Sequence, residues 1–456
     1  MSPARSPAQT VAERVRKSGA NKVKVAVTDI DGVLRGKYIH RDKFLSALES
    51  GFGFCNVVLG WDSSDVCYDN VTYTGWHTGY PDALVRLDPG TYREVPWDGG
   101  VPFLLGDFVD AEGEPLAVCP RQLLKRVLAR LQAAGYSAYA SLEYEFFHFR
   151  ETPQSLEQKS FANPEPISPG MFGYSLLRMN QSRDYLNALM DELLAFGVPL
   201  EGLHTETGPG VMEAAIVYSE PLEAADRAML FKTGSKEIAR RFGIMPTFMA
   251  KWNADLPGSS GHIHQSLWDR AGKRNLFFDA KAKGRPSALF EHYIAGQLTC
   301  MPELLPMYAP TINSYKRLVE GAWAPTKANW GTDNRTCALR FIPGSAKSAR
   351  LETRVNGADS NAYLALAAAL ASGLYGIENK LSLQPEVSGS GYADTKGKPL
   401  PRNLLEASER FSKSKLSRSL FGDAFVDHFA ATREWEYRQY ARAVTSWELK
   451  RYFEII

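Results

Sequence analysis

The chain has 456 residues, which is long enough for two domains or for a large domain that carries a smaller one. Hydrophobic residues make up 44% of the sequence and charged residues 23%, as is typical of a globular enzyme. The formal net charge of +2 gives no electrostatic reason to expect nucleic acid or a membrane surface as a partner. Five cysteines without a CxxC pair favour a reducing, cytoplasmic location.

The sequence shows neither a secretory signal nor a membrane-spanning segment. The basic first residues lack the apolar stretch of a secretory signal, so we expect a flexible arm over residues 1–21. The longest apolar run, Tyr363–Tyr375, is too short to span a bilayer. It is typical of a buried helix with Asp359 or Ser360 as its N-cap.

Residues 22–112 contain short strand-like segments separated by turns. Apolar residues alternate with other residues along Lys22–Ile30. An Asp-Gly turn follows, and then a second candidate strand, Arg35–His40, so the sequence predicts a hairpin. Asn56–Trp61 and Ala83–Leu87 are further candidate strands. The sequence therefore predicts a small β-rich domain over residues 22–112.

From residue 113 onwards, helical and strand periods alternate. A clear amphipathic helix is expected at Arg121–Ala134. The expected strands are Ser141–Phe149, Leu200–Glu206, Gly210–Val217, Gly261–Trp268, Ala338–Ile342 and Arg350–Val355. The expected helices are Ser182–Phe196, Pro221–Phe242, Ser287–Met301 (stopped by Pro302) and a charged helical tail from Pro401. The fold class is α+β, with a catalytic domain over residues 113–456.

Two pairs of glutamates lie on candidate strands. Strand periodicity puts Glu143 and Glu145 on one face, and burying two carboxylates side by side requires a neutralising cation. Glu206 and Glu213 flank a Gly-Pro-Gly turn, so adjacent strands could present both to one point. A solvated strand face is the alternative, but the apolar neighbours of the first pair argue against it.

Two later segments add imidazole and guanidinium groups. His262 and His264 share a strand face after a Gly/Ser loop. Arg350, Glu352 and Arg354 alternate along another strand. Each segment alone has a structural explanation, as a satisfied histidine or an ion-pair ladder. Further cations suited to carboxylates and phosphates lie upstream: Arg317, Arg335, Arg340 and Lys347.

Taken together, these groups suit phosphoryl transfer at a divalent cation. Carboxylates with one imidazole favour Mg²⁺ or Mn²⁺ over structural zinc. Surrounding arginines supply the charge neutralisation on which phosphoryl transfer depends. The sequence has no Walker A loop.

In this order and spacing the motifs resemble glutamine synthetase, from about residue 22 to Ile456. The segments that carry the resemblance are Glu143-Tyr-Glu145-Phe-Phe, Glu206 and Glu213 around Gly-Pro-Gly, Gly258-Ser-Ser-Gly-His262-Ile-His264-Gln-Ser266, Asn313-Ser-Tyr-Lys-Arg317, Asn334-Arg335-x4-Arg340-Phe-Ile-Pro and Lys347-Ser-Ala-Arg350-Leu-Glu352-Thr-Arg354. The pattern is most similar to the γ-glutamylamine and γ-glutamylpolyamine synthetases of that superfamily.

The resemblance implies a β-grasp-like small domain and a role for each matched residue. Metal ligands would be Glu145, Glu206 and Glu213 for a first ion, and Glu143, His262 and Glu352 for a second, with two or three Mg²⁺ or Mn²⁺ ions per site. ATP would contact Glu201, His264, Ser266, Lys347 and Arg350. Glutamate would meet Arg317, Arg354, Gly258, Glu145 and His262, and the transferring phosphoryl group would meet Arg335, Arg340 and Arg350.

The implied reaction forms γ-glutamyl phosphate, from which an amine displaces phosphate. The resemblance also implies a homo-oligomeric ring, a hexamer or dodecamer, with active sites between subunits. A neighbour's small domain would supply part of the amine site, with Asp62 as the amine-site carboxylate and Tyr174 nearby.

Three departures from the family pattern concern the substrates. Trp323 stands where ammonia-using members carry a glutamate that closes over the site and helps deprotonate ammonium. An indole offers an apolar face instead, so we expect an amine other than ammonia. Pro257 and Val211 also depart from the pattern on glutamate-pocket loops. Asp65 or Asp69 could hold the far end of a polyamine, and the sequence leaves a bulky monoamine, a polyamine and ammonia open.

Two other classes of protein compete with this interpretation. Thr28-Asp29-Ile-Asp31-Gly fits the opening motif of haloacid-dehalogenase-type phosphatases, but a second strand follows it where that fold has a helix. A non-catalytic relative that kept the fold would have lost metal ligands, whereas the matched positions still carry Glu or His.

Overall fold

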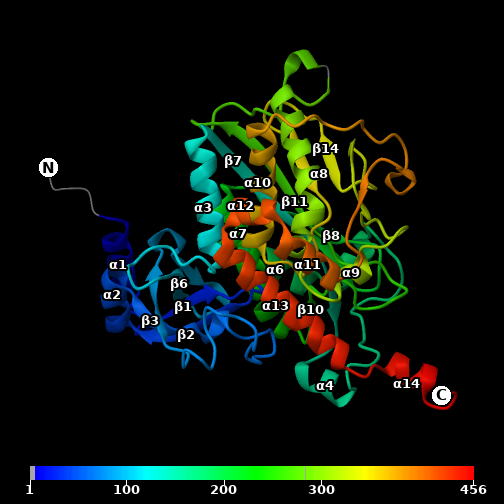
Figure 1. The fold of residues 1–456 in the computed structure, drawn as a ribbon. Helices are drawn as coiled ribbons and strands as arrows, with labels where there is room; N and C mark the ends of the chain where they lie inside the picture. The colour runs from blue at the N-terminus through cyan, green and yellow to red at the C-terminus, as the bar shows by residue number, and fades with distance from the viewer. Residues whose placement is uncertain (1–5, 283) are drawn as a thin grey trace.

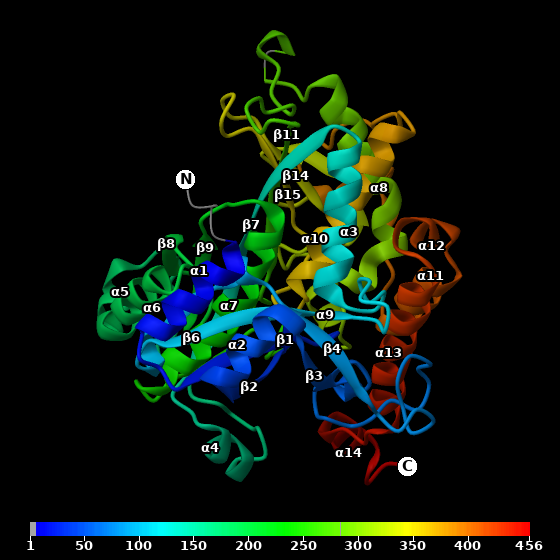
Figure 2. The same cartoon turned by 90° about the vertical axis from the view of Figure 1, so that its left-hand side faces the viewer.

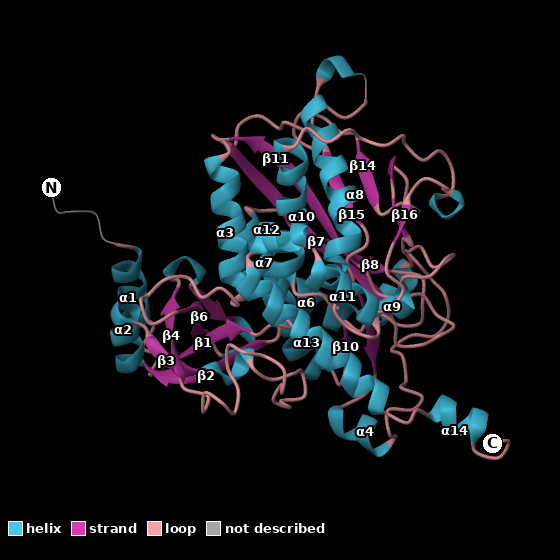
Figure 3. Cartoon of the chain, viewed as in Figure 1, coloured by secondary structure: helices cyan, strands magenta, loops and turns pink. Residues whose placement is uncertain are grey.

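The computed structural model describes residues 6–282 and 284–456, and Figure 1 shows a small domain beside a larger one. Each domain has one main sheet, with helices packed around it (Figure 3). No helix among the described residues is long and apolar enough to cross a membrane.

The small domain is built on a mixed sheet. Its strands are β1 (Lys22–Thr28), β2 (Leu34–His40), β3 (Phe52–Cys55), β4 (Asp82–Leu87), β5 (Arg93–Val95) and β6 (Val101–Val109). The order is β2-β1-β6-β4-β3; β5 also pairs with β6, and only the β1–β6 pair is parallel. Helix α2 (Arg41–Ser50) buries Phe44 and Ala47 against the sheet. The expected hairpin is confirmed, and this topology supports the β-grasp-like prediction.

The expectation of a flexible arm is wrong for residues 7–17, which form helix α1 (Pro7–Lys17). Val11 and Val15, one helical turn apart, are buried in the same core as Val23 and Phe44. Ser6 and Gln9 form a capping box at the start of the helix. Residues 1–5 lie outside the described residues. Two buried valines are too short an apolar stripe to predict a helix from the sequence. The helix forms because these valines pack into the core of the small domain.

The segment expected as a strand at Asn56–Trp61 is also different. Asn56–Leu59 forms a 3₁₀ turn, η1. The buried Asn56 side chain accepts a hydrogen bond from the Thr74 hydroxyl at 2.6 Å, which ties the turn to the loop that follows. The Gly60 N–H donates to the Val57 carbonyl at 2.7 Å, an i→i+3 bond that closes the turn.

The catalytic domain is built on a second sheet with the order β13-β14-β15-β11-β7-β9-β8. Its strands are β7 (Tyr136–Phe149), β8 (Leu200–Thr205), β9 (Val211–Ile216), β11 (Gly261–Asp269), β13 (Trp330–Thr332), β14 (Leu339–Ile342) and β15 (Arg350–Thr353), with β10 (Met245–Thr247) beside β7. Strands β12 (Lys327–Ala328) and β16 (Lys398–Pro399) form a separate two-stranded sheet. The strands expected in this domain are confirmed, although β7 begins five residues earlier than the sequence indicated.

Helices cover one face of this sheet and leave the other open. The covering helices are α3 (Pro120–Ala133), α7 (Pro221–Arg240), α8 (Ala288–Tyr308) and α10 (Ala362–Glu378). Tyr144 and Phe146 of β7 pack on Phe231 of α7. Because side chains alternate along a strand, Glu143 and Glu145 must point to the opposite face.

The remaining helices are α4 (Pro153–Gln158), α5 (Leu176–Gln181), α6 (Arg183–Ala195), α9 (Ser314–Arg317), α11 (Leu404–Lys413), α12 (Lys415–Phe421), α13 (Asp423–Arg442) and α14 (Ser446–Tyr452). The helical tail is therefore confirmed. Figure 2 shows α13 reaching past the catalytic domain to the loops of the small domain.

Two helix boundaries differ from expectation. Helix α8 continues through Pro302 and Pro306 to Tyr308, because its last turns are buried in the main core against α10 and α11. Helix α10 is capped by Asn361, not by Asp359 or Ser360. The Asn361 side chain accepts from the Tyr363 N–H at 3.0 Å and donates to two backbone carbonyls of the small domain.

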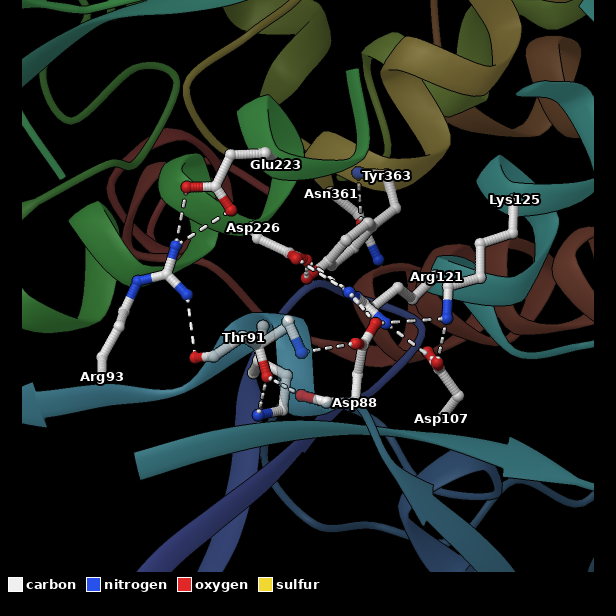
Figure 4. Close-up of polar contacts among 12 residues, drawn as sticks. Asp88, Thr91, Arg93, Asp107, Arg121, Lys125, Glu223, Asp226, Asn361 and Tyr363 are labelled. Carbon is white, nitrogen blue, oxygen red and sulfur yellow. Dashed lines mark hydrogen bonds and ion pairs between the residues drawn. The ribbon is translucent and has the colours of Figure 1, made fainter. Parts of the chain in front are cut away.

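A buried arginine holds the two domains together (Figure 4). Arg121, at the start of α3, pairs with Asp88 and Asp107 of the small domain and with Asp226 of α7, at 2.8–2.9 Å. The Tyr363 hydroxyl donates to the same Asp226 at 2.6 Å. A buried cation with this many carboxylate partners fixes the junction geometrically.

Candidate active site

The open face of the catalytic sheet gathers acidic and imidazole side chains through strand register. Glu143 pairs across strands with His262, and Glu145 pairs with Glu213. His264 in turn lies opposite Glu352. Antiparallel register therefore places residues from β7, β9, β11 and β15 at one point, although they are up to about two hundred residues apart.

One group of ligand-type atoms centres on Glu143. The His262 Nδ1 atom lies 3.4 Å from a Glu143 oxygen and 3.3 Å from a Glu352 oxygen. The His264 Nε2 atom lies 3.4 Å from the other Glu143 oxygen. The structure thus brings together the residues predicted for the second metal and adds His264, which the sequence assigned to ATP.

A second group centres on Glu213. The His204 Nε2 atom lies 3.3 Å from Glu206 and 3.4 Å from Glu213. Sequence reasoning missed His204, although it lies near the end of β8, two residues before Glu206, and so was expected on the same face. Glu145, predicted as a first-metal ligand, faces Glu213 across the strands and accepts from the Ser260 N–H at 2.7 Å.

The electrostatics of these groups fit a divalent cation. Burial, together with the charges of Glu143, Glu145 and Glu206, raises the pKa of Glu213 to about 10. Burial opposes ionisation of Glu352, yet His262 and Arg354 hold its pKa at about 2. Carboxylates that repel one another beside imidazoles form the donor set that Mg²⁺ or Mn²⁺ would neutralise.

A cavity of about 210 Å³ lies beside the Glu143 group. Its lining includes every residue predicted to contact ATP, namely Glu201, His264, Ser266, Lys347 and Arg350. Sequence reasoning missed its aromatic wall, formed by Tyr139, Tyr218 and Trp268. Tyr139 lies edge-on to Trp268, with ring centroids 5.4 Å apart, and the strand alternation from Ser141 and Glu143 could have indicated it.

Three of the predicted arginines converge on the Glu143 group. Arg340 donates through Nη1 to Glu352 at 3.1 Å and through Nε to Asp333 at 2.9 Å. Arg354 donates to the other Glu352 oxygen at 2.5 Å. Arg350 donates to His264 Nδ1 at 3.3 Å.

Two of the predicted glutamate-binding residues, Gly258 and Arg354, lie against Arg317. Its guanidinium is buried and donates to the carbonyls of Val355 and Arg354 at 3.1 and 2.9 Å. Burial lowers its pKa to about 10. A Cβ atom on Gly258 would lie 2.6 Å from the Ala250 carbonyl, so only glycine brings the backbone this close. Val211 packs with Phe147 and Phe149 in the core.

Trp323, Arg335 and Tyr174 lie at the rim of the site. Trp323 is 65% exposed, has a φ of 57°, and lines a cavity of about 720 Å³ with Arg335. Tyr174 also has a positive φ, 55°, and its ring stacks on His204 with centroids 4.4 Å apart. Positive φ at two large aromatic residues is a costly conformation that tends to occur at functional sites.

Among the described residues, no contact joins Asp62 to the Glu143 group or the Glu213 group of its own chain. One of its oxygens accepts from the N–H groups of Ser64 and Val66, and the other accepts from Trp435 of α13. The residue predicted for the amine site is therefore held on the small domain by the C-terminal helix.

Comparison with known proteins settles the family. Residues 117–452 match the glutamine synthetase catalytic domain. The chain belongs to the glutamine synthetase family. Enzymes of this family use ATP and divalent metal ions, and the groups around Glu143 and Glu213 are suited to hold such ions.

Three curated relatives are similar along nearly the whole chain. Type-1 glutamine synthetase 2 of Dictyostelium discoideum is 52% identical, over 98% of this chain and 86% of the relative. Glutamate–isopropylamine ligase of a Pseudomonas species is 37% identical, over 98% of both. γ-Glutamylethanolamide synthetase GlnA4 of Streptomyces coelicolor is 38% identical, over 100% of both.

A solved structure of GmaS in complex with ADP superimposes with a TM-score of 0.85 at 28% identity, covering 97% of this chain and 99% of GmaS. The predicted fold class, family and reaction type, ATP-dependent ligation of glutamate to an amine, are confirmed. The role of each site residue stays a prediction.

Proposed function

We propose that this enzyme joins the γ-carboxylate of glutamate to a small monoamine bulkier than ammonia. The observation that carries the proposal is Trp323, an exposed indole beside Arg335 where ammonia-using members of the family carry a glutamate. An indole cannot take a proton from ammonium, but it can cover an alkyl group or hold an alkylammonium ion at its face.

The first half-reaction uses the residues on the open face of the sheet. ATP would bind in the cavity beside Glu143, with its base near the aromatic wall and its phosphates near Lys347 and Arg350. Divalent ions held by the two groups would neutralise phosphate charge. Arg340 would stabilise the transferring phosphoryl group, while Arg317 and Arg354 would hold glutamate so that its γ-carboxylate attacks in line.

The second half-reaction needs a base for the incoming ammonium group. Asp62 would take this role, contributed by the small domain of a neighbouring subunit in a ring. The contacts of Asp62 support this placement, because it is fixed to α13 and not to its own acidic groups. Tyr174, stacked on His204, would border the same pocket. The cysteines are free, which is consistent with a cytoplasmic enzyme.

The choice among amines rests on which acids remain free. Both candidates for the far end of a polyamine are already paired: Asp65 with Arg35 at 2.7 Å, and Asp69 with Arg438. This favours a monoamine, as do the relatives named for isopropylamine and ethanolamide. Ammonia is the second candidate, because the 52% identical relative is named a glutamine synthetase.

An amine panel tests the proposal. ADP release is measured with ATP, Mg²⁺ and glutamate plus isopropylamine, ethanolamine, putrescine, spermidine or ammonia, and the products are identified by mass spectrometry. We expect kcat/KM for a two- or three-carbon monoamine to exceed that for ammonia by at least about tenfold, a difference of ~1.4 kcal/mol. Ammonia as the best substrate would overturn the role of Trp323. No turnover with any amine would indicate a non-catalytic binding protein.

A further inference from the structure

A cavity of about 370 Å³ lies behind the metal-binding strand, outside the site described above. It is bounded by the β1–β2 turn (residues 31–34), by α7, by residues 247–250 and by residues near Thr311 and Asp359. None of the residues predicted to bind metal, ATP, glutamate or the amine lines it. Both domains contribute to its wall.

Two lysines from one face of α7 enter this cavity. Lys232 and Lys236 are four residues apart, so their side chains lie one above the other. Both ammonium groups approach the same Phe248 ring, at 5.7 and 5.8 Å from its centroid. Lys232 also donates to the Ser360 carbonyl at 2.8 Å and lies over the Tyr144 ring. The rings and the carbonyl orient the two ammonium groups without neutralising them.

Two acids, Asp31 and Asp359, line the same cavity as the lysines. Asp31 pairs with Arg433 at 2.5 Å. Asp359 accepts hydrogen bonds from the hydroxyls of Thr311 and Ser314, at 2.9 and 2.5 Å. Among residues 6–282 and 284–456, no carboxylate forms an ion pair with either lysine. Arg433 neutralises Asp31, whereas Asp359 keeps its negative charge and raises the pKa of Lys232, so a single carboxylate faces the two lysines.

Burial makes the charged form of Lys232 unfavourable. Burial lowers the pKa of Lys232 to about 7; the charge of Asp359 opposes this effect, and the smaller effect of the Lys236 charge adds to it. An anion placed between the ammonium groups would oppose the effects of burial and of Lys236 and would gain charge-assisted hydrogen bonds. Hydroxyl groups of Thr233, Thr247 and Thr311 also line the cavity and could donate to the same anion.

We propose that this cavity, between the β1–β2 turn and α7, binds a small oxyanion through Lys232 and Lys236. Phosphate and a short carboxylate both have the negatively charged oxygens that such a site would bind. Lys232 rests on Tyr144, which separates Glu143 from Glu145 on β7 and points to the helical face. The anion would therefore sit one side chain away from the metal groups, on the opposite face of the sheet, and in contact with both domains.

Competitive labelling of the full-length protein tests the proposal at the lysines themselves. Trace acetic anhydride acetylates only neutral amines, and mass spectrometry reports each lysine separately. The probe is inorganic phosphate against chloride at equal ionic strength, without nucleotide or divalent metal. A rise of about one unit in the pKa of Lys232 would reduce its labelling at pH 7 about fivefold. An arm with succinate in place of phosphate distinguishes a phosphate from a carboxylate ligand.

Internal and variant controls separate this site from the active site, which also has cations for phosphate. Lys43, exposed on α2, should be labelled equally with and without the probe. Lys236→Gln should abolish the effect at Lys232, whereas Arg240→Gln, one turn further along α7 and outside the cavity, should preserve it. The proposal is overturned if neither anion changes labelling of Lys232, if Lys43 responds equally, or if Lys236→Gln responds like the wild type.

Discussion

The indole Nε1 of Trp435 lies 3.0 Å from Oδ2 of Asp62 and donates a hydrogen bond to it. Trp435 belongs to α13, which also pairs Arg438 with Asp69 and accepts the Asn70 amide at the Ala431 carbonyl. The C-terminal helix therefore braces the loop that carries the proposed amine base. If Asp62 acts in the neighbouring subunit, this brace sets the position of the base.

Trp435→Phe should impair the amine step selectively. The phenyl ring keeps the packing against Tyr68, whose ring centroid lies 5.9 Å away, but it cannot donate to Asp62. We expect kcat to fall several-fold and KM for the amine to rise, with KM for ATP and glutamate unchanged. The lost hydrogen bond should reduce the free energy of unfolding by about 1 kcal/mol. Asp427→Asn, which breaks the exposed pair of α13 with Arg418 of α12, is the matched control; equal effects of both variants would contradict the brace.

Replacing Trp323 with Glu should move the preference towards ammonia. The side chain is 65% exposed, so the fold should tolerate the change. We expect the ratio of kcat/KM for the best monoamine to that for ammonia to fall at least about tenfold, because a carboxylate can accept a proton from ammonium and an indole cannot. Trp323→Phe should keep the monoamine preference. An unchanged ratio in Trp323→Glu would show that selectivity lies elsewhere.

The parts of this fold and site that depend on short-range alternation could be predicted from the sequence. β7 and β11 were identified because apolar and polar residues alternate along them, and alternation also placed the glutamate and histidine side chains on one face. Tertiary contacts decided the rest. Asp62 and Trp435 are 373 positions apart, so nothing near Asp62 indicates its partner.

The end of helix α8 and the helix at residues 7–17 were not predicted, again because tertiary contacts determine them. Pro302 normally stops a helix, but packing against α10 and α11 outweighs the missing hydrogen bond and carries α8 onward. Two valines in a basic segment predict nothing by themselves, yet the small-domain core makes a helix of residues 7–17. Intrinsic helix propensity predicts helix boundaries poorly where burial of side chains determines them.

Binding of Mn²⁺ to the metal-free enzyme at pH 8 should release protons. Without a cation, burial and neighbouring carboxylates raise the pKa of Glu213 to about 10, so the side chain is protonated at pH 8. The cation must displace that proton, and we expect about one proton per site from this residue. Isothermal titration in two buffers with different ionisation enthalpies measures the number. Glu213→Gln should release about one proton fewer, and the exposed variant Glu157→Gln should behave like the wild type; binding without proton release would contradict the prediction.

Removing Arg121 should destabilise the junction between the domains. Its side chain is 3% exposed and neutralises Asp107 and Asp226, whose side chains are 5% and 2% exposed. Arg121→Met leaves these carboxylates buried beside fewer cations, which should cost about 3–5 kcal/mol in chemical unfolding. Arg183→Met removes an exposed pair with Asp184 and should cost less than about 1 kcal/mol. Similar losses for the two variants would show that the buried network contributes little.

The buried His428 should make the protein less stable as the pH falls from about 6.5 to 4. Burial lowers its pKa from 6.5 to about 4. Between these values the unfolded chain binds a proton that the native state does not, so the free energy of unfolding decreases with falling pH. The effect should reach about 3 kcal/mol near pH 4.

His428→Phe isolates this effect, because a phenyl ring can keep the edge-on contact with Tyr73 at 6.3 Å between centroids. The difference in unfolding free energy between variant and wild type should grow in favour of the variant as the pH falls. Buried His148, whose pKa burial also lowers to about 4, remains in both proteins, so part of the pH dependence should persist. His77→Phe, at an exposed position, should leave the slope unchanged. Parallel pH profiles for wild type and His428→Phe would mean that His428 is not held neutral by burial.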